Sequence, residues 1–217
     1  AEHGVDMDSG AILSVTLRHA DLGDTTTIYQ TVTQASENLE KIVNAVPDAA
    51  ETIKPYVQEV VTDKGYHSKK VALVLEDAEI RTYLSEPARG RQKWDGERRE
   101  QQSVYANRRR IQGARGKKLM RRRGEKTERT FAHCYETGGL RRIHLRGHDN
   151  ILKRLLVHVV GFNLSLIFRK WFGHGTPREL AAAASARRVG AMDPLARPDL
   201  DRLMQAFPDS RPETRNQ

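Results

Sequence analysis

The sequence has little of several features that would place it in a common protein class. Its 217 residues include a single cysteine, Cys134, which excludes an internal disulfide framework and fits a reducing compartment. Hydrophobic residues make up 38% and the mean hydropathy is −0.66, so we expect part of the chain to be extended or solvated. No apolar run reaches the roughly 18 residues of a membrane helix. The most apolar stretch, 151–172, is interrupted by Lys and Arg, and no signal peptide is visible. We therefore expect no membrane partner.

Positive charge is concentrated in one part of the chain. The formal net charge is +9, yet residues 1–87 carry 7 Lys or Arg against 15 Asp or Glu. Residues 88–126 carry 15 Lys or Arg against 4 Asp or Glu. Because a solvated surface would mix the two signs, this basic segment predicts a polyanionic partner, with nucleic acid the first candidate. A solvated basic helix or a disordered arm would have the same composition.

Apolar periodicity predicts an α/β fold in which a mixed sheet is flanked by helices. The expected elements are a hairpin over 5–17, strands over 56–62 and 81–85, and helices over 28–45, 68–77, 97–111, 117–135 and 149–172. From residue 173 the composition shifts to proline with small and charged residues. We expect residues 173–217 to be a mostly disordered tail.

Two acidic residues are the candidates for chemistry. Asp63 follows the predicted strand 56–62, and Glu128 lies 65 residues later on a predicted helix, with the basic segment between them. If their carboxylates converge they can hold Mg²⁺, which prefers oxygen ligands, while nearby cations hold a phosphate backbone. The spacing leaves simpler roles open, since Asp63 can cap the following helix and Glu128 can form an exposed i,i+4 pair.

Several segments resemble, in order, the blocks of DDE-type transposases of bacterial insertion sequences. Asp63 opens the segment DKGYHS and Glu128 opens ERTF, which are similar to the second and third acidic motifs of that family. The other segments that resemble the family are residues 1–12, 21–27, 105–110 (YANRRR), 133–139 (HCYETGG), 141–147 (RRIHLRG) and 150–154 (NILKR), with Asn163 and Leu164. The resemblance covers roughly residues 1–172. It implies a ribonuclease-H-like fold with the basic helical segment 88–126 before the last acidic helix.

The resemblance implies metal-dependent DNA transposition by the intact parent protein. Asp63 and Glu128 would be catalytic and metal-binding, with two Mg²⁺ ions in the parent. The parent would cleave the DNA strand at element ends, and the freed 3′-hydroxyl would attack target DNA. DNA would be the partner, bound by a homodimer in the bacterial cytoplasm, in association with the nucleoid.

One departure from the family pattern bears on activity. The first catalytic Asp of the family lies on a strand upstream of the segment where this chain begins, and no residue here matches it. Asp6 and Asp24 instead fit a turn and an N-cap. We therefore expect the C-terminal part of a catalytic domain, inactive alone, which leaves its status as an enzyme open. The alternatives are a non-enzymatic DNA-binding remnant or regulator, a protein that orders on an acidic protein or RNA, and a metal-dependent nuclease.

The basic segment is expected to contact phosphates and not to read bases. The residues predicted to bind DNA are Arg108, Arg109, Arg110, Arg115, Lys117, Lys118, Arg121, Arg122 and Arg123. If several of them engage, affinity falls steeply with salt.

Overall fold

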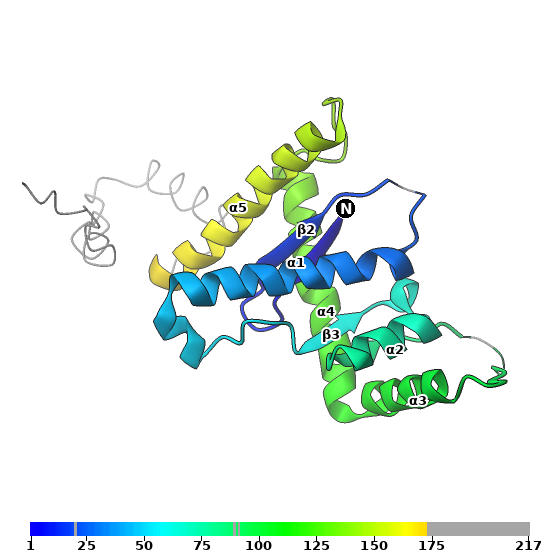
Figure 1. Cartoon of the computed structure of the whole chain (residues 1–217). Coiled ribbons are helices and arrows are strands. Elements are labelled where there is room, and N and C mark those ends of the chain that lie inside the picture. The colour runs from blue at the N-terminus through cyan, green and yellow to red at the C-terminus, as the bar shows by residue number, and fades with distance from the viewer. Residues whose placement is uncertain (20, 89, 91, 173–217) are drawn as a thin grey trace, which may run out of the picture. The chain divides into compact units, whose positions relative to one another are not determined.

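A computed structural model describes residues 1–172 except 20, 89 and 91. The predicted tail, 173–217, lies outside the described residues. The described part is a mixed α/β structure with small sheets and five α-helices, shown in Figure 1. Ala1–Leu166 form one compact unit, and the contacts described below lie within it.

The predicted hairpin is present, although its first strand begins earlier than expected. Strands β1 (Glu2–Val5) and β2 (Ile12–Thr16) pair antiparallel. Asp6 has the turn role that its position predicts, because its Oδ2 accepts a hydrogen bond from the Ser9 amide at 2.6 Å. Side chains alternate across a strand, so neighbouring residues of β1 reach different helices. Glu2 accepts hydrogen bonds from Thr27 and Thr31 of α1 (Asp24–Ala45), whereas His3 contacts Thr130 of α4 (Ala114–Ala132).

The second sheet joins β3 (Glu59–Thr62) to β4 (Arg81–Leu84) in parallel. A 3₁₀ turn, η2 (Lys64–Tyr66), and helix α2 (Lys69–Asp77) make the crossover. The Ser68 side chain caps α2 by accepting a hydrogen bond from the Val71 amide at 3.0 Å. The predicted strand ending before Asp63 and the helix after it are therefore both confirmed.

The strands do not form the single mixed sheet that we expected. Within the described residues they form two separate two-stranded sheets, one antiparallel and one parallel. The alternation of side chains specifies that a segment is a strand, but pairing depends on which edges the packing brings together. The fold class is thus α/β, with small sheets in place of one continuous sheet.

The basic segment and the chain after it are helical, as predicted. Short helix η1 (Pro47–Glu51) follows α1, and after β4 come α3 (Arg98–Gln112), α4, a π-helical turn η3 (His133–Thr137) and α5 (His148–Phe172). The corner between α3 and α4 is tight. A Cβ on Gly116 would meet the Ile111 Cα at 2.7 Å, so only glycine fits there.

Two apolar clusters hold the elements together. One comprises Ile12, Val15, Cys134, Leu140, Leu155, Val159 and Phe162, and it packs the hairpin against η3 and α5. The other comprises Ile28, Val71, Ala72, Leu75, Leu84 and Val104, and it packs β4 against α1, α2 and α3. The second cluster fixes the end of β3, where Asp63 lies, relative to the start of α1.

Two asparagines cover the outer strand edges. Asn107 of α3 accepts a hydrogen bond from the Leu84 amide at 2.8 Å and donates to the Leu84 carbonyl at 2.9 Å. Asn163 of α5 makes the same pair of bonds with Ile12, both at 2.9 Å. Backbone groups of an edge strand need partners, and each asparagine supplies one donor and one acceptor. Both asparagines lie in segments that resemble the transposase blocks.

Helix α5 is long and apolar enough to cross a membrane by length and composition, over His148–Trp171. This differs from the expectation that no such run exists, because the charged residues lie near the helix ends and leave a window of mean hydropathy 1.7. One such helix is weak evidence, since core helices of globular proteins pass the same test. Here α5 buries Leu155, Val159 and Phe162 in the hairpin cluster.

Candidate functional site

Asp63 lies at the carboxyl end of β3, where the strand turns into η2. Its side chain caps that turn by accepting a hydrogen bond from the Gly65 amide at 3.1 Å, so the capping role is observed. The other carboxylate oxygen lies 3.6 Å from the Arg123 guanidinium of α4. The Asp63 side chain is 50% exposed, which leaves it accessible to a ligand. The strand end therefore meets the helix that carries Glu128.

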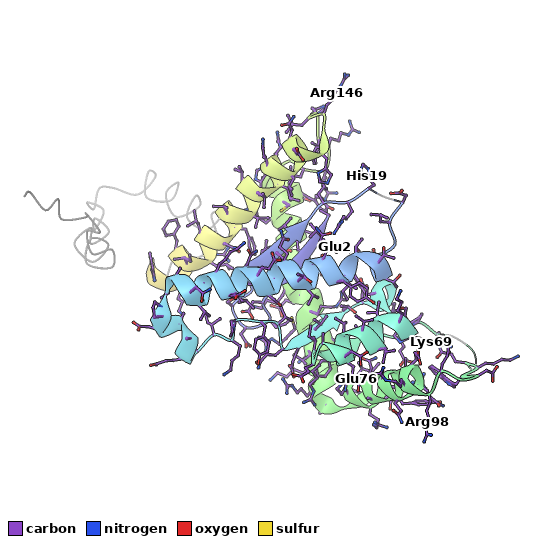
Figure 2. All side chains as sticks on the ribbon, in the orientation of Figure 1. Glu2, His19, Lys69, Glu76, Arg98 and Arg146 are labelled. Carbon is purple, nitrogen blue, oxygen red and sulfur yellow. The ribbon has the colours of Figure 1, made fainter. Side chains whose placement is uncertain are left out.

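Three carboxylates from distant parts of the chain act on Tyr66, and one of them, Asp24, lies near Asp63. Asp24, at the start of α1, and Asp63 both lie against the backbone of Gly65. Burial raises the pKa of Tyr66, and the charges of Glu2, Asp24 and Asp63 raise it further. Figure 2 labels Glu2 on its strand beside α1. This corner of the molecule therefore concentrates negative charge around Tyr66.

Asp24 does not have the capping role that its sequence position predicts. The N-cap of α1 is Gly23, whose position makes no side-chain cap bond, and Asp24 is the first residue of the helix. A negative charge in the first turn is favourable because it faces the positive end of the helix dipole. The sequence holds no signal for the approach of Asp24 to Asp63, because the two residues are brought together by packing between α1 and η2.

Glu128 is exposed on α4 and makes no ion pair with a described residue. The i,i+4 pair on this part of the helix joins Arg129 to Glu125 at 2.7 Å instead. Five residues separate Glu128 from Arg123, which is about 140° around a helix axis. Since Arg123 faces Asp63, Glu128 projects from a different side of α4, and no contact joins the two carboxylates.

The described residues do not form a complete divalent-cation site. Within this part of the chain, no three His, Cys, Asp or Glu side chains are grouped so that they could hold a metal ion. Asp63 already has a guanidinium partner in Arg123. A Mg²⁺ site needs several oxygen ligands at close range, so a pair consisting of Asp63 and Glu128 is insufficient in this arrangement.

Five of the nine predicted DNA-binding residues have partners within the fold. Their partners are Glu86 for Arg108 (2.9 Å), the Thr82 carbonyl for Arg110 (2.8 Å), Glu59 for Arg115 (2.6 Å), Asp8 for Arg122 (3.0 Å) and Asp63 for Arg123 (3.6 Å). The hydrogen bond to Glu86 raises the pKa of Arg108. These arginines join α3 and α4 to the hairpin and to the second sheet.

The other four predicted residues form what we call the free cation set: Arg109, Lys117, Lys118 and Arg121. All four are exposed, and none makes an ion pair with a described residue. Lys117 and Arg121 are one turn apart and so share a face of α4. Residues of one helix that carry unpaired positive charge can follow a phosphate backbone.

Two family models match parts of the chain. Residues 88–168 match the family model described as "Transposase DDE domain", a match that includes α3, α4 and Glu128. Residues 171–210 match a second family model, "Phage tail assembly chaperone protein, TAC", and almost all of that segment lies outside the described residues. No curated protein and no solved structure matches the chain.

The matched transposase segment contains the later segments of the sequence resemblance, whereas the motif with Asp63 lies before it. It spans the block with Asn107, the acidic motif with Glu128 and the amphipathic helix with Asn163. DDE transposase domains generally depend on divalent metal ions and act on DNA. Residues 88–168 of this chain are thus similar to the DDE domain of transposases.

Proposed function

We propose that the chain is the C-terminal part of a transposase catalytic domain. The intact parent cleaves DNA at the ends of an insertion sequence and transfers the strand to target DNA, whereas this chain binds DNA without cutting it. The contact between Arg123 and Asp63 carries the proposal, because it joins the strand end with the second acidic motif to the helix of the third. The catalytic part is residues 1–172, with 88–126 as its basic helical segment.

The carboxylates support the prediction that the chain is inactive alone. Asp63 and Glu128 are the two residues that match acidic motifs of the family. Glu128 projects from a side of α4 other than the one that faces Asp63. A guanidinium beside Asp63 supplies the positive charge that a metal ion would otherwise supply to that carboxylate. Two Mg²⁺ ions in the parent would need further oxygen ligands besides these two carboxylates.

The uncovered edges of β1 and β3 support a further strand of the parent protein between these two strands. Asparagines cover the outer edges of β2 and β4, but no such residue covers β1 or β3 among the described residues. Helix α4 contacts both of these strands. One further strand between β1 and β3 would join the two sheets into the mixed sheet of a ribonuclease-H-like fold.

Strand cleavage by two forms of the protein tests the proposal. A labelled duplex from the ends of the encoding element is incubated with Mg²⁺ or Mn²⁺, and with either this chain or a form extended upstream by its own reading frame. We expect cleavage and joining by the extended form alone. Asp63→Asn and Glu128→Gln should abolish both activities. Glu125→Gln is the matched control, because Glu125 lies on the same helix and is paired with Arg129.

Cleavage by the unextended chain that disappears in Asp63→Asn would contradict this view of the fragment. A second function, a DNA-binding remnant or regulator, is favoured by the ion pair that occupies Asp63. That reading predicts an extended form that binds the duplex and never cuts it. A homodimer on DNA is expected under both readings, and sedimentation with and without duplex measures it.

A further inference from the structure

A pocket of about 660 Å³ lies away from Asp63, where four elements meet. The end of α2, strand β4, the end of α3 and the start of α4 surround it. Figure 2 labels Glu76 on α2, which lines this pocket, and Arg98 at the far end of α3. The charged residues that line the pocket are Arg81, Arg109, Arg110, Arg115, Glu76 and Glu79. Guanidinium groups therefore outnumber carboxylates in its wall.

Residues outside the pocket lining hold three of these arginines in place. Glu59 of β3 lies 3.8 Å from Arg81 and 2.6 Å from Arg115, so one carboxylate positions both side chains. Arg110 is fixed by hydrogen bonds to the carbonyl and hydroxyl of Thr82, at 2.8 and 2.6 Å. Arg109 is exposed and makes no ion pair with a described residue. The guanidinium of Arg109 can therefore bind a ligand without giving up an ion pair.

The start of α4 adds backbone donors to the same pocket. Gly113 is the N-cap of α4 and makes no side-chain cap bond, and Gly113, Ala114 and Arg115 all line the pocket. The first amides of a helix have no partner within the helix, and the helix dipole favours an anion there. Gly116 permits the close approach of α3 that fixes this helix start.

Tyr83 is an independent sign of a ligand. Its side chain lines the pocket and is 1% exposed, and its hydroxyl has no hydrogen-bond partner among the described residues. A buried hydroxyl without a partner is costly and uncommon in folded proteins. An acceptor atom at the inner end of the pocket would satisfy it.

We propose that this pocket binds one phosphate group of a DNA backbone. Guanidinium, amide and hydroxyl groups all donate hydrogen bonds, and a phosphate oxygen accepts them. Glu76 and Glu79 oppose an anion, so the bound group lies toward Arg109 and the start of α4. The inference rests on the DNA binding of the proposed function, and it adds Arg81 and Tyr83 to the contacts. Inorganic phosphate offers the same chemistry as a small probe.

Duplex binding by single variants tests the pocket within the whole chain. Arg109→Gln should lower affinity roughly tenfold at 0.1 M salt and reduce the log–log salt slope by about one. Arg98→Gln removes an equal charge from the other end of α3 and should have a smaller effect. Tyr83→Phe should weaken binding several-fold while the free protein unfolds at the same or a higher temperature, because the lost hydroxyl had no partner.

Thermal unfolding in inorganic phosphate, compared with chloride at equal ionic strength, tests whether the pocket binds free phosphate as well as a phosphate of DNA. We expect phosphate to raise the unfolding temperature of the wild type and of Arg98→Gln more than that of Tyr83→Phe or Arg109→Gln. If Tyr83→Phe and Arg109→Gln bind the duplex no more weakly than Arg98→Gln, the proposed phosphate site in the pocket is wrong. The proposal that the chain binds DNA would stand. Phosphate stabilisation through Tyr83 without any duplex binding would overturn DNA as the source, and the proposed function with it.

Discussion

His3 is a partly buried histidine whose ring is held between the hairpin and α4. Its Nδ1 lies 3.0 Å from the Thr130 hydroxyl, and its ring stacks on Phe131 with centroids 4.2 Å apart and planes at 5°. The Nε2 atom is buried without a hydrogen-bond partner in the described structure. Burial lowers the pKa of His3 from 6.5 to about 4. The folded protein therefore holds a neutral ring at pH values where the unfolded chain is protonated.

This difference predicts acid sensitivity in a defined window. Because the folded pKa is the lower one, the stability contribution is complete above pH 6.5 and is lost as the pH falls toward 4. The loss should reach about 2–3 kcal/mol in the free energy of unfolding. Urea unfolding at a series of pH values measures it, and His3→Asn should flatten the profile in that window. Parallel profiles for the two proteins would show that another group is responsible.

Residue identity predicted some roles and missed others. Asp63 and Asp6 behave as their local sequence indicates, because turns and caps depend on neighbours within a few positions. Asp24 approaches Asp63 only after α1 has packed on η2, and a pattern within one helix cannot reveal that. The site role of Glu128 stays a prediction. In this arrangement α4 presents Arg123 to Asp63 in its place.

At the scale of elements, the asparagine contacts hold each sheet to a helix. Asn107 is 0% exposed, and its side chain satisfies both backbone groups of Leu84. Asn107→Ala would leave a buried amide and a buried carbonyl unpaired, so we expect a loss of about 2–5 kcal/mol in unfolding free energy. Chemical denaturation measures this loss.

Ser103 offers a matched control one turn earlier on α3. It is also buried, but its hydroxyl bonds only to the Arg99 carbonyl within the same helix. Ser103→Ala should therefore cost less than about 1 kcal/mol. Equal losses for the two variants would mean that Asn107 contributes packing alone and that the strand edge finds other partners.

Elements were more predictable than the way they pair. The periodicity of α1 to α5 identifies every long helix, because amphipathic spacing is a property of one segment. The division into two sheets was not predictable, since strands of four or five residues carry no signal for which neighbour they bond. The two edge-covering asparagines lie in segments that resemble the family, but their contacts span 23 and 151 positions along the chain.

Across the whole molecule, basic residues divide into those that hold the fold together and those that remain available. The free cation set should give DNA binding a log–log salt slope of about −3 to −4 if all four residues contact phosphates. Lys117→Gln with Arg121→Gln should reduce that slope by about two units. Fluorescence anisotropy across a salt series measures the slopes. The control is Lys41→Gln with Lys54→Gln, which removes equal charge outside the basic segment and should change the slope far less.

The contact of His3 with Thr130 has a consequence for how the protein is made. The two residues are 127 positions apart, so β1 cannot gain its α4 partner until α4 has left the ribosome. At roughly 5–20 residues per second, the nascent hairpin waits on the order of ten seconds with one face uncovered. During that interval it is open to chaperones and to strands of other nascent chains. Slower translation of the arginine codons in α3 and α4 would lengthen the time for which this face of the hairpin is uncovered. It would lower the yield of folded protein.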